Sequence, residues 1–284
     1  MRRAIVFLFS LTLLLSADAV GAAGGPSPGL QIGWDGVRAG AVRYVALPGS
    51  DASTAVAAIR VSDGRVLRYD TVSGVFGVPL VSFDGRAEGL SRDGRSLVLA
   101  TFPGPQAGGT TEFVVLSPRT LKVRTRITLR GSFAYDALSP DGSTMYVLQY
   151  LSNGANARYR VRAVDVRAGR LLPGAIVDRR EPDEQMHGSP VTRATGTNGR
   201  WAYTLYGRGA AEPFVHALDT RGRVAFCIDL PWRNTQDSIV TVRMGLSRGG
   251  RLLVLRQPRI GRLAEIDTTT WKVRVLRRPV GGSA

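Results

Sequence analysis

The sequence is poor in the residues that cross-link or activate proteins: it has one cysteine, two histidines and two lysines among 284 residues. The lone Cys227 excludes an intrachain disulfide, but a chain of this length can bury a large enough core without one. Cys227 stands in the apolar run 224–228, which is typical of a small buried side chain rather than a nucleophile. No glycine-rich phosphate-binding fingerprint occurs. We expect no metal ion and no cofactor.

Lysine and aromatic side chains are scarce beside arginine. Thirty-six of the 38 basic residues are arginine, the net charge is +16, and aromatic residues make up 7% of the chain. The arginines are scattered, and no basic run is longer than pairs such as Arg179-Arg180. Because nucleic-acid binding needs a clustered basic stripe with stacking aromatics, no nucleic-acid partner is predicted. A positive surface of this kind still permits contact with an anionic envelope surface.

Long hydrophobic runs are also missing, apart from one at the N-terminus. Two arginines precede an apolar run from Ala4 to Leu15, and small residues follow it up to Ala23. This order is typical of a secretory signal peptide, and the run is shorter than the roughly 20 residues that span a bilayer. We expect a cleaved signal over residues 1–23 and a secreted or extracytoplasmic protein of the cell envelope. The alternative is a membrane tether formed by an uncleaved signal.

A repeat of about fifty residues runs through the rest of the chain. An apolar strand that ends in a polar turn recurs five times, with its anchor residues 47, 48, 54 and 48 positions apart. The anchors are Asp70, Ser117, Asp165, Asp219 and Asp267. Short strands and turns at this spacing predict an all-β fold, a β-propeller. We expect five four-stranded blades, with six as the alternative, over residues 41–284, and an N-terminal segment over 24–40.

The strands of the blades are predicted between Gly, Pro, Asp and Ser turns. Blade one is assigned strands 41–47, 54–61, 64–70 and 76–82, and the first strands of blades two to five are 86–90, 133–138, 190–194 and 239–245. A second motif, Ser-x-Asp-Gly, follows the first strand in blades two and three. Its Asp bonds back to backbone amides and its Gly supplies a positive φ. We therefore interpret these acids as turn formers and not as catalytic groups.

Blades three and five each contain a stretch that matches one half of a known repeat. Blade three reads LSPDGSTMYV over residues 138–147, and blade five reads IDTTTWKV over residues 266–273. These stretches resemble the two halves of YVTN-type repeats, which belong to the WD-repeat-like propeller group. The resemblance covers residues 41–277 and is weakest in blades one and four. It implies a surface-layer-associated protein, a binding scaffold or an enzyme, so the family assigns no activity by itself.

A ligand site in a propeller is expected on the face that carries the longer, irregular loops. The loop 179–190 is the richest of them in acidic and basic side chains. Its candidate catalytic residues are Glu181, Asp183, Glu184 and His187, which have acid–base chemistry. The candidate ligand-binding residues are Arg180, His187, Trp232, Arg233, Asn234 and Asp237, where the tryptophan would form a platform for a carbohydrate or peptide.

Other polar residues are predicted near the axis or inside a blade. Asp84, Asp136 and Asp237 fall in loops or first strands that can approach the central channel. His216 lies in the middle of a strand, where alternation separates it from Val215 and Ala217, and it is predicted to be packed.

Two classes of function fit these observations. The leading hypothesis is a binding or scaffold module that recognises a protein, a peptide or an envelope glycan through its irregular loop face. The rival is a metal-assisted hydrolase, lyase or lactonase that uses inward acids and His187 at the central channel. We favour the first, because no assembled catalytic set is found in the sequence. A plugged channel would count against the rival.

Overall fold

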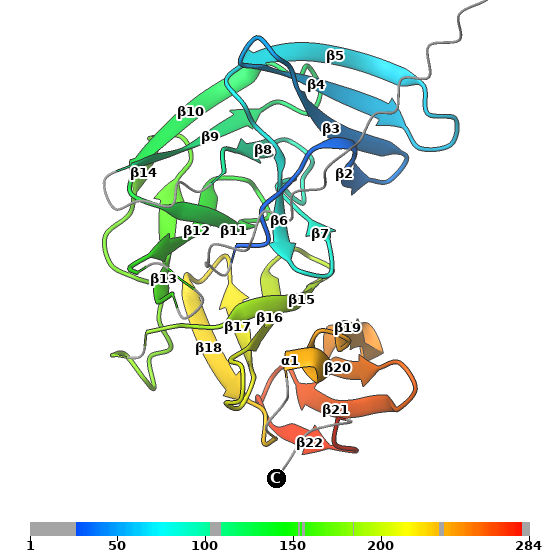
Figure 1. The fold of residues 1–284 in the computed structure, drawn as a ribbon, viewed down its shortest axis with the longest axis vertical. Coiled ribbons are helices and arrows are strands. Elements are labelled where there is room, and N and C mark those ends of the chain that lie inside the picture. The colour runs from blue at the N-terminus through cyan, green and yellow to red at the C-terminus, as the bar shows by residue number, and fades with distance from the viewer. Residues whose placement is uncertain are drawn as a thin grey trace, which may run out of the picture.

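The computed structural model describes residues 27–102, 109–152, 154, 157–183, 185–232 and 236–279. In these ranges the chain is all-β, with one short helix, α1 (Gln236–Ile239), and one 3-10 turn. Antiparallel sheets follow one another around a centre as the blades of a propeller (Figure 1), which confirms the predicted fold. The predicted signal peptide lies outside the described residues. Within them, no helix has the length and apolar character needed to cross a bilayer.

Five blades form the propeller in the described part of the chain, and each runs from an inner to an outer strand. Blade one is β2 (Gly33–Ala39), β3 (Val42–Pro48), β4 (Ser53–Arg60) and β5 (Val66–Ser73). Blade two is β8 (Leu97–Ala100), β9 (Thr110–Leu116) and β10 (Val123–Arg130), with a bridge from Leu90 to Leu97 on its inner edge. Blade three is β11 (Phe133–Leu138), β12 (Thr144–Tyr150), β13 (Tyr159–Asp165) and β14 (Arg170–Leu171). Blade four is β15 (Ser189–Thr195), β16 (Trp201–Gly207), β17 (Phe214–Asp219) and β18 (Val224–Asp229). Blade five is β19 (Arg243–Ser247), β20 (Leu252–Gln257), β21 (Gly261–Asp267) and β22 (Val273–Val275).

Blade one begins one strand earlier than the sequence predicted. The predicted first strand, 41–47, is the second strand β3, and the true first strand β2 lies in the segment assigned to 24–40. Residues 76–82 were expected as the fourth strand, but they hold β6 (Val78–Ser82), which lies outside the blade. The physical reason is that β2 contains two glycines and little apolar alternation, so its pattern is weak. The propeller therefore starts at residue 33.

The centre of the propeller is filled by a small hairpin of β6 and β7 (Arg86–Ala87). Strand β6 packs beside β8, β11 and β15, which come from three different blades (Figure 1). At the hairpin turn, Phe83 N donates to Pro190 O at 2.8 Å and Asp84 N donates to Val191 O at 3.2 Å. The short β1 (Leu30–Gln31) pairs with the other edge of β6. The axis is thus occupied by backbone and its side chains.

In blades two to five, the repeat seen in the sequence is a repeat of turn geometry. In blade one the predicted anchor Asp70 lies inside strand β5, paired with Val56, and not at a turn. Four equivalent turns between the third and fourth strands place one residue in the left-handed region, with φ of 53–66°. These residues are Leu121, Gly169, Arg223 and Trp271, and each donates its N–H to the carbonyl four residues earlier. In the Ser-x-Asp-Gly turn of blade three, Ser139 Oγ donates to Asp141 at 2.6 Å and Gly142 has φ of 71°. The interpretation of these residues as turn formers is confirmed.

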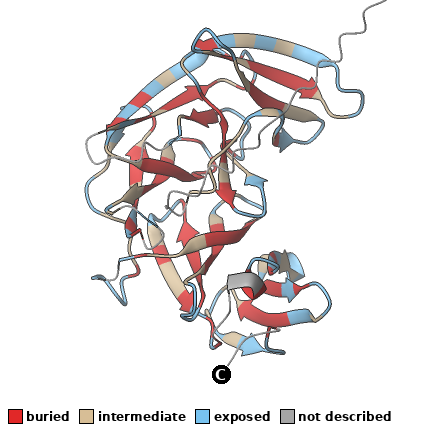
Figure 2. Cartoon of the chain, in the orientation of Figure 1, coloured by how far each residue is buried: buried red, intermediate tan, exposed pale blue. Residues whose placement is uncertain are grey.

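Buried apolar clusters fill the junctions between successive blades. One cluster joins blades one and two, the next joins two and three, and two more join three to four and four to five. Among the described residues, no such cluster joins blade five to blade one. The blades therefore form an open arc, whose two ends are separated on one side of the molecule (Figures 1 and 2).

Candidate functional site

The predicted residues of the loop 179–190 do not form one site. Arg180 binds Asp178 through Nε and Nη2, with the shortest contact at 2.5 Å, and its Nη2 also donates to Cys227 O at 2.9 Å. Glu181 and Asp183 are exposed, and His187 is half-buried before β15. Glu184, Arg233, Asn234 and the side chain of Asp237 lie outside what the structure describes. Within the described part, no group of three or more His, Cys, Asp or Glu side chains could hold a metal ion.

Trp232 is not an exposed platform. Its side chain is only 2% exposed and lies in the cluster between blades four and five, with Leu230, Ile239 and Val242. Its Nε1 has no hydrogen-bond partner in the described part of the chain. The prediction of an aromatic ligand surface at this position is therefore wrong, because the chain after β18 turns inward and covers the junction with the tryptophan.

Two of the three acids predicted near the axis, Asp84 and Asp136, lie on the elements that pack at the centre, and both are held there by partners. Asp136 on β11 makes a buried ion pair with Arg193 Nη2 on β15, and Arg193 Nη1 stands 3.7 Å from Glu88. Burial opposes the charge on Arg193, but these two carboxylates raise the pKa of its guanidinium above the ordinary value. Asp84 accepts hydrogen bonds from Ser82 and Thr192, each at 2.6 Å. These acids stabilise the packing of the inner strands.

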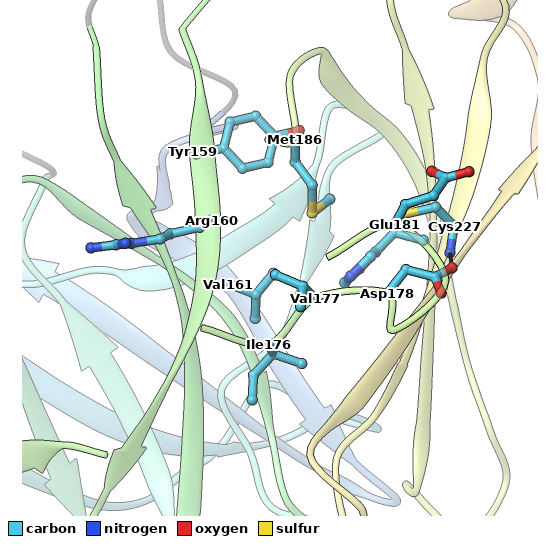
Figure 3. A pocket seen from close by; sticks show the side chains of 10 residues that line it. Tyr159, Arg160, Val161, Ile176, Val177, Asp178, Glu181, Met186 and Cys227 are labelled. Carbon is cyan, nitrogen blue, oxygen red and sulfur yellow. Dashed lines mark hydrogen bonds between the residues drawn. The ribbon is translucent and has the colours of Figure 1, made fainter. Parts of the chain in front are cut away.

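A small cavity of about 20 Å³ lies between blades three and four. Its walls come from β13, from the segment between β14 and β15, and from β17 and β18 (Figure 3). Its lining includes Tyr159, Asp178, Glu181, Met186, His216 and Cys227. In Figure 3 the side chains of Met186 and Cys227 extend from different segments of the wall. No direct signal for this site exists in the sequence, since its residues come from four segments.

His216 is packed as predicted, and it belongs to a polar row across blade four. Arg193, Thr204, His216 and Cys227 stand directly opposite one another on successive strands β15 to β18. Among the described residues, Arg193 Nε, Thr204 Oγ1 and His216 Nε2 find no hydrogen-bond partner, although all three atoms are buried. Burial lowers the pKa of His216 to about 4, against a smaller opposite effect of Asp136, so the imidazole is neutral at physiological pH.

Asp178 fixes one wall of the cavity. Its Oδ2 accepts the backbone N–H of Cys227 at 2.8 Å, and its carboxylate is paired with Arg180. Burial raises the pKa of Asp178, but the hydrogen bonds from Arg180 and from the backbone outweigh it and the net shift is downward. The carboxylate is therefore ionised and fully engaged.

A second candidate surface is the face of blade one that points away from blade two. Val45, Ala57 and Tyr69 stand opposite one another on β3, β4 and β5. Val45, Ala57, Ile59 and Leu47 form a small apolar cluster that is separate from the four junctions. We call Val45, Leu47, Ala57, Ile59, Val66 and Tyr69 the open face of blade one. Tyr69 is 76% exposed and Val66 45%, whereas Val45, Ala57 and Ile59 are buried, so the part of this face that meets solvent is its outer edge on β5.

Comparisons with known proteins assign neither a family nor a function to this chain. No family model matches the chain, and no curated protein matches it. It is similar to solved structures of Kuenenia stuttgartiensis hydrazine synthase (16% identity, 84% of this chain and 69% of that chain, TM-score 0.47) and of the Myceliophteria thermophila Cps50 (Swd1) β-propeller domain (12%, 88% and 71%, TM-score 0.47). It is also similar to TolB from Acinetobacter baumannii (11%, 83% and 57%, TM-score 0.38). The chain is a β-propeller, and its likeness to YVTN repeats stays a resemblance.

Proposed function

We propose that this chain is an extracytoplasmic binding propeller that docks a protein partner on the open face of blade one. The observation that carries the proposal is the pairing of an apolar blade face with the open side of the arc. Of the thirteen large apolar side chains that are exposed in the described part of the chain, six lie between residues 32 and 75, in or beside blade one, and three of these, Val66, Leu67 and Tyr69, lie on its outer strand β5. A concentration of exposed apolar surface of this kind is typical of an interaction site.

The occupant we propose is a β-sheet or strand with apolar side chains and acidic neighbours. The opposite face of blade one packs against a sheet, through Tyr44, Ala46 and Val56, so its other face has the shape to accept one. Arg38 and Arg43 stand opposite each other on β2 and β3, beside the open face, and Arg38 is exposed. The charge of Arg38, on a chain of net charge +16, favours a partner with acidic flanks, whereas Arg43 already stands 3.7 Å from Asp35.

The other hypotheses have less support from the described residues. The glycan hypothesis depended on an exposed Trp232, which is buried. The loop 179–190 uses Arg180 internally, against Asp178. The enzyme hypothesis needed inward acids with room for a substrate at the axis, where β6 is packed and Asp136 is paired with Arg193.

The proposal is tested by site-specific cross-linking followed by a binding measurement. A photo-reactive phenylalanine in place of Tyr69, in the full chain and in the cells that make it, should cross-link one protein. The same group in place of Val123, which is 42% exposed on β10 of blade two, should not. Binding of that purified partner should weaken about tenfold or more in Tyr69→Asp and less than about twofold in Val123→Asp. Equal weakening in both variants, or a cross-link to a second copy of this chain, would overturn it.

A further inference from the structure

The cavity between blades three and four brings together three side chains that can each bind a soft metal ion. Its lining includes the imidazole of His216 together with the thioether of Met186 and the thiol of Cys227, and all three are soft or borderline metal ligands. Figure 3 labels the methionine and the cysteine. Met186 comes from the segment before β15, Cys227 from β18 and His216 from β17. Met186 is 8% exposed, His216 is 1% exposed and Cys227 is half-buried, so the three side chains are largely screened from bulk water.

The geometry allows one ion to reach the histidine and the cysteine together. His216 and Cys227 are directly opposite in the antiparallel pair of β17 and β18. Such neighbours hold their Cβ atoms about 4.5–5.5 Å apart, and their side chains leave the sheet on the same face. Metal bonds of about 2.0 Å to nitrogen and 2.3 Å to sulfur fit within that separation. Met186 approaches from the opposite wall, because its backbone is bridged to Tyr159 of blade three.

One ring nitrogen of His216 lacks a hydrogen-bond partner among the described residues, and this points to a ligand. His216 Nε2 is buried and has no hydrogen-bond partner among the described residues, and a buried polar atom of this kind is rare in folded proteins. The backbone of Cys227 is fixed on both sides, with its N–H held by Asp178 and its carbonyl held by Arg180. The cysteine strand therefore needs no rearrangement to present its side chain.

We propose that this cavity binds a single Cu⁺ ion through Cys227 Sγ, His216 and Met186 Sδ. Thiolate and thioether sulfur select Cu⁺ over the harder divalent cations. The described residues also offer no cluster of three His, Cys, Asp or Glu side chains of the kind that zinc or calcium would use. Binding exchanges the thiol proton for the metal, so that one proton is released and a Cys–S–Cu unit without net charge remains. A neutral unit is the form that a small, mostly apolar cavity tolerates best.

The test is an anaerobic titration of the full chain with Cu⁺ in competition with a chromophoric Cu⁺ chelator. The wild-type protein should take up one equivalent, and native mass spectrometry should show a single copper. Cys227→Ser should weaken binding by about a hundredfold or more, and Met186→Leu by about tenfold. Met244→Leu is the matched control, since Met244 is also buried, at 9% exposed, and should leave binding unchanged. X-ray absorption at the copper edge should show one nitrogen and two sulfur scatterers.

Each alternative has its own result. If the wild-type protein takes no copper from the chelator, the cavity holds a water molecule only and the proposal fails. It also fails if Zn²⁺ binds as tightly as Cu⁺, or if Met244→Leu weakens binding as much as Met186→Leu. Thermal melting of Cys227→Ser without copper shows whether that variant is folded. Should it not fold, the Met186→Leu and Met244→Leu pair decides the question alone.

Discussion

The two faces of blade four pack against their neighbouring blades with different kinds of side chain. The face towards blade five is apolar, with Leu205, Val215 and Ala217 in a cluster that also contains Trp232 and Leu255. The face towards blade three mixes Tyr206 and Phe214 with the row of Arg193, Thr204 and His216, and it leaves polar atoms unpaired among the described residues. The first arrangement is enough to join two blades. The packing against blade three is less stable, because it leaves buried polar atoms without partners. The cavity with Cys227 and Met186 lies on that side, which marks this junction as the specialised one.

The largest expected effect comes from breaking the charge pair on the blade-three side. Arg193→Met removes the cation that Asp136 and Glu88 share. We expect a loss of about 3–5 kcal/mol in the free energy of unfolding, measured by urea denaturation, because a buried carboxylate is left unpaired. The double variant Arg193→Met with Asp136→Leu should regain most of that loss. If the double variant is as unstable as the single one, the pair of Arg193 and Asp136 stabilises the fold by more than the mutual neutralisation of its two buried charges.

The apolar side of blade four should be sensitive to lost volume. Leu205 is 1% exposed, and Leu205→Ala should lower the free energy of unfolding by about 3 kcal/mol through the cavity it leaves. The matched control on the other face is His216→Leu, which replaces a side chain with an unsatisfied buried nitrogen and should change stability by less than about 1 kcal/mol. Both are measured by urea denaturation. Equal losses in the free energy of unfolding would mean that the two faces pack equally well, which would contradict the difference described above.

The sequence predicted the strands of blades three and four closely, because clear turn signals separate them. In blade two the predicted first strand, 86–90, was wrong: Arg86–Ala87 is β7 of the central hairpin, and only Leu90 bridges to blade two. The sequence missed β2 of blade one, where glycines hide the alternation, and it placed the first strand of blade five too early, at 239–245 instead of β19 (Arg243–Ser247). The four residues of α1 stand at the start of that predicted range. Turn chemistry is local, so it can be read from neighbouring residues.

The candidate sites could not be predicted in the same way, since they depend on which segments meet. Trp232 stands between Pro231 and Arg233, a polar setting that suggested exposure, but its burial depends on Ile239 and Val242. Alternation did place His216 on the opposite face from Val215, which was correct. Nothing in the sequence indicated that Met186 would reach the same cavity from another segment.

A smaller effect is expected from the charge pair at the outer turn of blade four. Asp219 accepts hydrogen bonds from Arg200, at 2.5 Å from Nη2, and from the N–H groups of Arg221 and Gly222 at 3.0 Å. Burial raises its pKa, but these bonds lower it by more, so the net shift is downward. Since the folded pKa lies below the unfolded value near 3.8, the stabilisation is present above about pH 4 and is lost as the pH falls through the folded pKa.

Asp219→Asn should therefore cost about 1–2 kcal/mol at neutral pH, and the gap to the wild type should close as the pH falls through the lowered pKa of Asp219. Urea denaturation from pH 7 downward measures it. The control is Asp267→Asn at the equivalent turn of blade five, where the carboxylate accepts N–H groups of Thr269 and Thr270. The more accessible Asp267 should matter less. A gap that stays constant with pH would show that the charge on Asp219 contributes nothing.

The smallest effect tests the repeated turn itself, at the same end of blade four. Arg223 has φ of 53°, in the left-handed region where a side chain is strained and glycine is not. Arg223→Gly should raise the free energy of unfolding by about 0.5–1 kcal/mol, measured as a shift of the urea midpoint. Arg221→Gly, two residues earlier and outside that region, should lower it, because glycine there only adds freedom to the unfolded chain. Because blade three already has Gly169 at the equivalent position, the opposite signs would show that the turn geometry, and not the residue at it, is what the blades share.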